Sequence, residues 1–204
     1  MIHSTKFEGH QDSVLCLDHT STSAPGSLLS GSEDGTCRLW DLRTRRASLC
    51  IRCPGRKKVL SVAFGPRTDL DGGLKETPLF SQNYTVYAAV ETSVFAFDLR
   101  KAGAPIIDAS NWTVEDESCI LHALDEINQI AFASNLPTQD APPSIHLAAG
   151  DDTGSVRVTT NFSAECVYQH GADSMVTSLT FRPIGKKQRQ LLLASGGTDC
   201  RVNI

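Results

Sequence analysis

The feature that most constrains the fold is a short pattern that occurs four times along the chain. Each copy has a β-branched residue, an apolar residue three positions later and, in three of the four copies, a phenylalanine two positions beyond that. The four segments read HQDSVLCLDH, KKVLSVAFGP, DEINQIAFAS and SMVTSLTFRP. Recurrence at intervals of tens of residues indicates a repeat architecture, in which each unit buries its apolar face against its neighbours.

Each copy is followed by the same series of strand-like segments. A second apolar segment (SLLS, YTVYAA, SIHLAA, QLLLAS) leads into a turn, and a third follows (TCRLWD, SVFAFD, SVRVTT, RVNI). A fourth short segment (ASLCIR, PIIDA, AECVYQ) separates consecutive units. The sequence therefore predicts an all-β chain of four units, each with four antiparallel strands. The expected bounds of these units are approximately 1–43, 44–100, 101–161 and 162–204.

Two of the units exceed the roughly 40–45 residues that are usual for a four-stranded repeat of this kind. The additional residues fall between the first and second strands, in GPRTDLDGGLKETP (65–78) and NLPTQDAPPS (135–144). Both stretches are rich in Pro, Gly and Asp, so we interpret them as loop insertions.

The first unit carries a recognisable motif. Gly9-His10, Ser30-Gly31-Ser32, Asp34 and Trp40-Asp41 resemble a WD repeat, the blade of a β-propeller. The resemblance covers the whole chain, strongly in the first unit and degenerately in the others. It implies that His10, Ser30, Asp34 and Trp40 form a structural set of hydrogen bonds that ties the blade together. We do not interpret the Ser, His and Asp of this set as catalytic, because no oxyanion hole or strained nucleophile turn accompanies them.

The later units indicate which group of WD proteins the chain resembles and how many blades it has. DEINQIAF before LAAGDDTGSVRV, and VTSLTFRP before LASGGTDCRV, are similar to the WD repeat-containing protein 53 family. Propellers close with about 4–8 blades, and WD proteins typically carry seven. A closed four-bladed ring is one option, but we interpret the chain as a partial or open β-propeller of about four blades. Its fourth unit ends at Ile204, one residue before the expected Trp, so we expect a truncated product.

A second motif occurs at the end of the third strand in the first two units. Trp40-Asp41-Leu42-Arg43 is followed one unit later by Phe97-Asp98-Leu99-Arg100. In WD proteins that dock on the large propeller adaptor of cullin–RING ubiquitin ligases, paired W-D-x-R motifs make the contact. The resemblance therefore implies four adaptor-binding residues: Asp41, Arg43, Asp98 and Arg100. The alternative is a local ion pair within each turn, which contributes little to binding or stability.

Composition excludes several other functions. The net charge of −4 provides no general attraction to nucleic acids or anionic membranes, and we interpret the basic clusters at 55–58 and 185–189 as solvated turns. No stretch is long and apolar enough to span a bilayer, and we expect an intracellular protein of the cytoplasm, the nucleus or both. The seven cysteines are expected to be buried thiols. The Cys50-x-x-Cys53 pair lacks a second pair of ligands, so we expect no metal or other cofactor.

The leading hypothesis is therefore a non-enzymatic scaffold for protein partners, acting as the substrate receptor of a cullin–RING ubiquitin ligase. The alternative is a chromatin- or peptide-binding reader that uses the central channel of the propeller. The sequence shows no set of carboxylates, metal ligands or nucleophiles that would support catalysis or a small-molecule substrate.

Overall fold

In a computed structural model of the chain, residues 5–20, 26–65, 85–99, 106–107, 119–135, 144–182 and 191–204 are described. Their strands form four sheets, which follow one another in chain order. The first sheet contains β1 (Val14–Thr20), β2 (Ser27–Ser32), β3 (Thr36–Asp41), β4 (Arg46–Arg52) and the two-residue β8 (Ile106–Ile107). The second contains β5 (Val59–Phe64), β6 (Thr85–Val90), β7 (Ser93–Asp98) and β9 (Cys119–His122).

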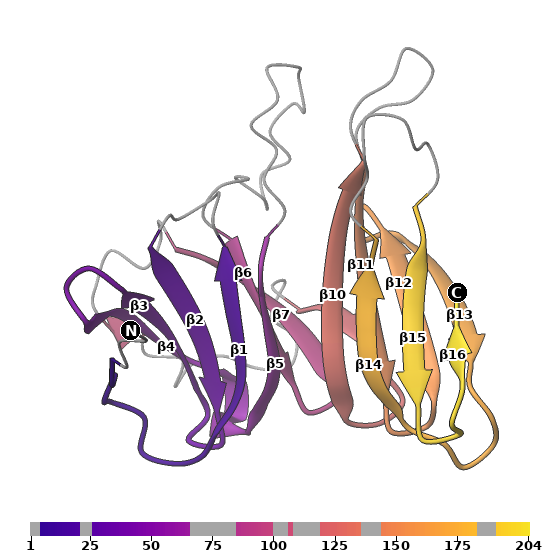
Figure 1. The fold of residues 1–204 in the computed structure, drawn as a ribbon, viewed down its shortest axis with the longest axis horizontal. Helices are drawn as coiled ribbons and strands as arrows, with labels where there is room; N and C mark the ends of the chain where they lie inside the picture. Colours follow the sequence, from indigo (N-terminus) through magenta and orange to yellow (C-terminus); the bar gives the residue numbers. More distant parts are fainter. Residues whose placement is uncertain are drawn as a thin grey trace, which may run out of the picture.

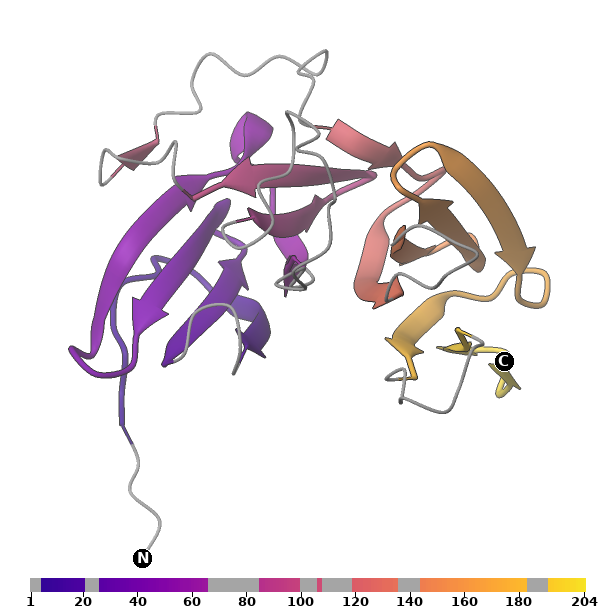
Figure 2. The same ribbon diagram turned by 90° about the horizontal axis from the view of Figure 1, so that it is seen from above.

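The third sheet contains β10 (Ile127–Asn135), β11 (Ser144–Asp151), β12 (Ser155–Thr160) and β13 (Ala164–Gln169). The fourth contains β14 (Val176–Phe181), β15 (Leu193–Gly197) and β16 (Val202–Asn203). A short 3-10 helix, η1 (Pro54–Arg56), connects the first two sheets. Seen from above, the sheets are arranged around an arc that stays open between the first and the fourth (Figures 1 and 2). The predicted all-β fold, with about four propeller blades in an open arrangement, is confirmed.

One strand assignment was wrong. The PIIDA segment was expected to form a short strand between the second and third units, but Ile106 and Ile107 pair in parallel with Cys50 and Ile51 of β4. The fourth strand of the second sheet is β9, which pairs antiparallel with β7. Pairing β9 with β7 places Leu121 in the buried core between the second and third sheets. Burial of this side chain favours β9 over the nearer isoleucine pair.

Neighbouring sheets pack through the first strand of each. Val62 of β5, Ile130 of β10 and Leu179 of β14 occupy equivalent positions opposite the second strand of their own sheets. Each contributes to the apolar cluster shared with the preceding sheet, and each is only 4–6% exposed. Leu17 has the same position in β1 and is 62% exposed, because no sheet in the described part of the chain packs on it. The first strand of a blade is therefore buried by the blade before it.

Small residues on the second strand make room for this packing. A Cβ on Gly31 would lie 2.6 Å from both Cys16 Sγ and Val59 Cγ1. A Cβ on Gly150, the equivalent position in the third sheet, would overlap the side chain of Val176. The valines of one sheet thus fill space left open by glycines of the previous one, which brings the two backbones close together.

Hydrogen bonds connect the same strands along the inner edge of the arc. The backbone N–H of Ile130 in β10 donates to Ser61 Oγ of β5 at 3.1 Å. At the equivalent place in the next pair of sheets, the N–H of Leu179 donates to Gln129 Oε1 at 3.4 Å. Each sheet thus supplies an acceptor for a backbone donor on the inner edge of the next, so this donor is not left unpaired in the interior.

We predict that Gly150→Ala lowers the free energy of unfolding by about 1–3 kcal/mol, because the added methyl group overpacks the contact with Val176. Gly196→Ala is the matched control. Gly196 has the equivalent position in the fourth sheet, and the nearest atom to a Cβ there is Ser178 Cβ at 4.0 Å. Urea unfolding followed by circular dichroism measures both losses. Equal losses in the two variants would contradict the close contact between the third and fourth sheets.

Candidate functional site

The structure joins His10, Ser30, Asp34 and Trp40 in one chain of hydrogen bonds. The indole Nε1–H of Trp40 donates to Ser30 Oγ at 2.8 Å, and Ser30 Oγ lies 2.6 Å from His10 Nε2. On its other side, His10 Nδ1 lies 2.9 Å from Asp34 Oδ2. With a neutral imidazole protonated on Nδ1, every donor in this series meets an acceptor: indole to hydroxyl, hydroxyl to imidazole, and imidazole to carboxylate.

These side chains come from three places in the first blade and are shielded from water. His10 precedes β1, Ser30 is in β2 and Trp40 is in β3, while Asp34 lies in the turn between β2 and β3. The side chains of His10 and Asp34 are 5% and 8% exposed. Trp40 also packs edge-on against Phe7, with ring centroids 5.7 Å apart. The segment before β1 is therefore held on the face of the sheet by both polar and aromatic contacts.

The carboxylate of Asp34 is the most heavily bonded group of the network. Burial would raise its pKa, but hydrogen bonds from the Thr36 hydroxyl, the backbone N–H of Gln11 and His10 outweigh burial and lower the pKa to about 2. Thr36 Oγ1 donates to Asp34 Oδ1 at 2.6 Å, and the N–H of Gln11 donates to Asp34 Oδ2 at 2.9 Å. Asp34 is therefore ionised at neutral pH and organises the turn around it.

The other sheets keep this network to different extents. In the fourth sheet, His170 lies 2.8 Å from Ser195 Oγ and 3.1 Å from the carboxylate of Asp199, which is an equivalent set of contacts. The second sheet instead has Ala88 and Phe97 at the positions of Ser30 and Trp40. The blades therefore do not all contain the same network of polar hydrogen bonds.

His122 is the last residue of β9 in the second sheet. Its Nδ1 is 2.9 Å from Ser93 Oγ, on the neighbouring strand β7. This histidine therefore contributes to its own sheet.

The turn after β3 holds Asp41 and leaves Arg43 in solvent. Asp41 Oδ1 accepts the backbone N–H groups of Arg43 at 2.8 Å and Thr44 at 3.2 Å. These two bonds lower the pKa of Asp41. The guanidinium of Arg43 makes one contact with Asp41 Oδ2, at 3.4 Å, and its side chain is 84% exposed. Asp41 thus shapes the turn, and Arg43 presents a planar group of hydrogen-bond donors to the surroundings.

The second half of the motif is described only in part. Phe97 and Asp98 end β7, which corresponds to β3 in the second sheet. Because the two sheets have the same strand order, the ends of β3 and β7 lie at the same edge of the arc (Figure 1). Arg100 and the side chain of Asp98 lie outside the described residues.

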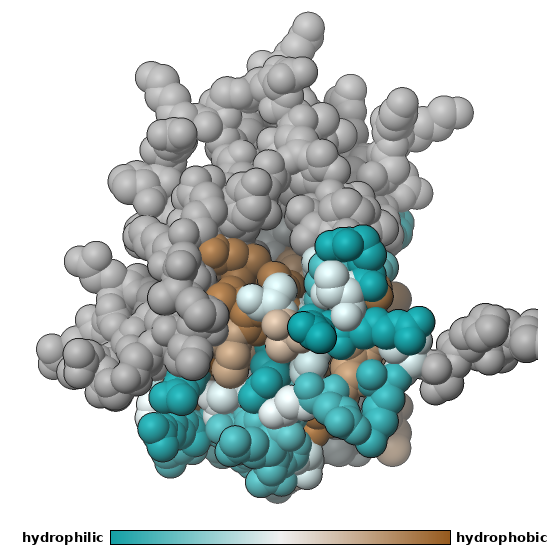
Figure 3. Space-filling model, turned by 90° about the vertical axis from the view of Figure 1, so that its left-hand side faces the viewer, coloured by the Kyte–Doolittle hydropathy of each residue, from teal (hydrophilic) through white to brown (hydrophobic). Residues whose placement is uncertain are grey.

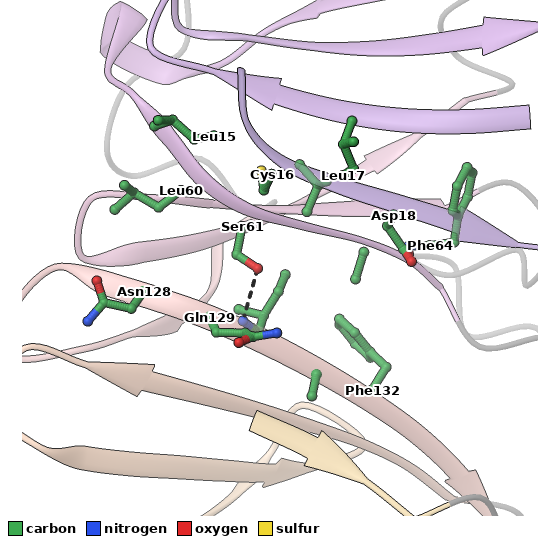
Figure 4. Close-up of a pocket in the computed structure, with 14 residues that line it drawn as sticks. Leu15, Cys16, Leu17, Asp18, Leu60, Ser61, Phe64, Asn128, Gln129 and Phe132 are labelled. Carbon is green, nitrogen blue, oxygen red and sulfur yellow. Dashed lines mark hydrogen bonds between the residues drawn. The ribbon is translucent and has the colours of Figure 1, made fainter. Parts of the chain in front are cut away.

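A pocket of about 450 Å³ lies along the inner strands β1, β5 and β10 (Figure 4). Apolar side chains, among them Leu15, Leu60 and Phe132, line it together with Asp18, Ser61, Asn128 and Gln129. Several of its polar groups are already used within the fold. Asp18 Oδ2 accepts the N–H of Phe64, and Asn128 Nδ2 donates to Asp152 and to the carbonyl of Val176. The pocket therefore has a lining of apolar and polar groups, and several of the polar groups already bond within the fold.

The cysteine pair that meets in space is not the one that stands out in the sequence. Cys37 and Cys53 are buried free thiols with their Sγ atoms 3.5 Å apart. The pairing of β3 with β4 sets Cys37 opposite Ile51, two residues before Cys53, so strand register and not the Cys-x-x-Cys spacing brings them together. Within the described ranges, no group of three or more His, Cys, Asp or Glu side chains is placed to hold a metal ion.

Comparisons with known proteins agree with this geometry. Residues 2–41 match the family model described as WD domain, G-beta repeat. The chain is 29% identical over 190 residues to the WD repeat-containing protein 53 homolog of Dictyostelium discoideum, covering 92% of the chain and 43% of that relative. It is also 24% identical over 95% of its length to the protein transport protein SEC31 of Ajellomyces capsulatus, of which it covers 13%. A 61-residue segment, 29% of the chain, is 43% identical to 8% of the ribosome biogenesis protein BOP1 of Rattus norvegicus.

The chain spans less than half the length of each of these relatives. The four sheets have the arrangement of WD-repeat blades, and the family match itself covers the first of them. The first blade carries the full polar set, and the similarity to the WD repeat-containing protein 53 homolog extends along nearly the whole chain. A helix capable of spanning a membrane is not found in the parts of the chain that the structure describes.

We predict that the contribution of Ser30 to the free energy of unfolding depends on Trp40, because the two side chains are hydrogen-bonded. Ser30→Ala leaves a buried indole N–H and an imidazole nitrogen without the hydroxyl, at an expected cost of about 2–4 kcal/mol. Trp40→Phe should then cost less in the Ser30→Ala background than in the wild type, because the second sheet already combines Ala88 with Phe97. A double-mutant cycle by urea unfolding measures the coupling, expected at about 0.5–3 kcal/mol. Strict additivity would contradict the network.

The lowered pKa of Asp34 predicts a dependence of stability on pH. A carboxyl group with a pKa near 2 in the folded state and about 3.9 in the unfolded state stabilises fully above pH 4. This contribution is lost as the pH falls from about 4 to 2. Asp34→Asn should therefore flatten the fall in unfolding free energy over this range, measured by urea titration at each pH. Asp12→Asn, at an exposed position nearby, is the control, and an equal effect of both would contradict the assignment.

Proposed function

We propose that the chain is a non-enzymatic interaction scaffold that docks on the propeller adaptor of a cullin–RING ubiquitin ligase. The observation that carries the proposal is the turn after β3, where Asp41 is fixed by two backbone hydrogen bonds while Arg43 is exposed. A fixed turn lowers the entropy cost of presenting the guanidinium to a partner. The equivalent Phe97-Asp98-Leu99-Arg100 segment, at the end of β7, would provide a second point of contact at the same edge.

The chemistry of arginine favours docking over a purely local role. Arg43 meets Asp41 through a single contact of 3.4 Å, which is longer than a good charge-assisted hydrogen bond. The turn itself is held by two backbone hydrogen bonds to Asp41 Oδ1, so it does not depend on the guanidinium of Arg43. The guanidinium donors of Arg43 can therefore bind carboxylates or carbonyl groups of a partner without breaking the turn.

The names of the relatives support the broader part of this proposal. They connect similar chains with protein transport and with ribosome biogenesis, which suits a framework that presents surfaces for different partners. On this proposal the partners are proteins, and recruitment of a ligase adaptor is the specific role of Asp41, Arg43, Asp98 and Arg100.

A second candidate function uses the inner-strand pocket of Figure 4 to read a peptide, as a chromatin- or peptide-binding protein would. Its volume of about 450 Å³ suits a short peptide segment. Its polar residues Asp18 and Asn128, however, already bond within the fold. We therefore rank adaptor docking first.

The test is to measure adaptor binding by biolayer interferometry with Arg43→Ala, Arg100→Ala and the double variant. Each single substitution is expected to weaken binding about tenfold or more, because truncating a central interface arginine commonly costs at least about 1–2 kcal/mol. The melting temperature should hardly change, since Arg43 is exposed. Arg46→Ala is the matched control, at an exposed position three residues away.

The proposal fails if the wild type does not bind the adaptor, or if the double variant binds it as strongly as the wild type. Leu60→Asp separates the second candidate, because it places a charge in the inner-strand pocket and leaves the turn after β3 unchanged. Loss of partner binding in this variant alone would favour the peptide reader.

A further inference from the structure

Three arginines surround a small pocket at one end of the first sheet. Arg38 is in β3, Arg52 is the last residue of β4 and Arg56 ends η1. Together with Gln11 and Asp34, they line a cavity of about 170 Å³. The pocket lies beside the turn from β2 to β3, and this lower end of the sheet is largely hydrophilic (Figure 3).

Two glycines allow the pocket to form. A Cβ on Gly35, whose φ is +76°, would lie within 2.8–2.9 Å of backbone atoms of Arg56. The turn and η1 therefore pack backbone to backbone, which brings Arg56 beside β3. A Cβ on Gly9 would lie 2.5 Å from Arg38 Nη1. The segment before β1 thus passes close over the guanidinium of Arg38, which only a glycine permits without displacing it.

The pocket has more positive than negative groups. Its only carboxylate among the lining residues is Asp34, and both oxygens of Asp34 already accept hydrogen bonds from His10, Gln11 and Thr36. The Nε of Arg38 is buried and makes no hydrogen bond among the described residues, and the same holds for the Nε of Arg157 at the equivalent position of the third sheet, so the difference between the two sheets lies in the neighbouring charges. A buried, charged donor without an acceptor is costly, and in native proteins it commonly marks the place of a bound ion or water.

The third sheet provides an internal comparison. Strand pairing places Arg157 at the position of Arg38 and Gln169 at the position of Arg52. Asp173 lies four residues after Gln169, as Arg56 lies four residues after Arg52, so the two correspond. Both have a positive φ, of 56° for Asp173 and 53° for Arg56. The third sheet thus has one arginine and one aspartate where the first sheet has three arginines. The accumulation of positive charge is particular to the first sheet and is not a requirement of the blade.

We infer that this pocket binds a phosphoryl group, held by the guanidinium groups of Arg38, Arg52 and Arg56. Planar guanidinium groups bind tetrahedral oxyanions through paired hydrogen bonds, and several arginines around a small pocket are typical of phosphate recognition. The group can belong to free phosphate or to a phosphorylated residue of a protein partner. The site is separate from the proposed adaptor contact, because Arg52 pairs opposite Thr36 at one end of the β3–β4 hairpin and Asp41 lies opposite Arg46 at the other.

The test is calorimetric titration of the chain with inorganic phosphate and with a phosphoserine pentapeptide, at matched ionic strength. We expect saturable binding at one site per chain for at least one of the two probes. Arg52→Gln combined with Arg56→Gln should weaken this binding at least about tenfold, through the loss of two charge-assisted contacts. Arg46→Gln, in the same strand as Arg52 but at its other end, should bind like the wild type. Circular dichroism checks that each variant remains folded.

The two probes distinguish the sources of the phosphoryl group. Tighter binding of the phosphopeptide than of phosphate, with no binding of the unphosphorylated peptide, assigns the site to a phosphorylated partner. Equal or tighter binding of phosphate alone assigns it to the free ion. Absence of saturable binding with both probes overturns the inference, and so does an equal loss in Arg46→Gln and in the pocket variant. Because Arg43 and Arg100 are unchanged, adaptor binding is unaffected by either result.

Discussion

The contact that the rest of the structure depends on is the packing of each first strand on the sheet before it. Val59 and Val62 fill the space left by Gly31, and Val176 and Leu179 fill the space left by Gly150. Repeating this contact buries one apolar layer per pair of sheets, as in other repeat proteins whose stability comes from nearest-neighbour interfaces. It also explains why Leu17 of β1 is largely exposed, since a first strand is buried only by a preceding sheet.

Because packing between sheets supplies most of the apolar burial, the polar network within each blade is free to vary. The first and fourth sheets keep a histidine bonded to a serine and an aspartate. The second replaces the serine and tryptophan with Ala88 and Phe97, which removes a donor together with its acceptor. Removing both partners leaves no buried group unsatisfied, whereas losing only one would be costly. The loss of the serine and tryptophan in the second sheet is therefore compatible with the fold.

The sequence was sufficient to predict the features that repeat, because each copy supports the interpretation of the others. The four sheets belong to this group, whereas the contact of His10 with Ser30 was expected only from the resemblance of the first unit to a WD repeat. Features produced by a single pairing were missed: Ile106 joins β4, and Cys37 meets Cys53 because of the register between β3 and β4. The arginine pocket was missed for the same reason. Residues 55–58 looked like a solvated turn, and only the packing of Gly35 against Arg56 shows that this turn folds back on Arg38.

The first blade places two chemically different surfaces at opposite ends of one rigid hairpin. Between the exposed turn of Asp41 and Arg43 and the pocket of Arg52, the strands β3 and β4 bury Leu49 and Ile51 in the core shared with the second sheet. A ligand at one end cannot shift the hairpin without disrupting this core, since close-packed interiors resist small displacements. If both proposals hold, the two ends bind their ligands at the same time and independently. For a scaffold this is an advantage, because binding one partner need not weaken the hold on another.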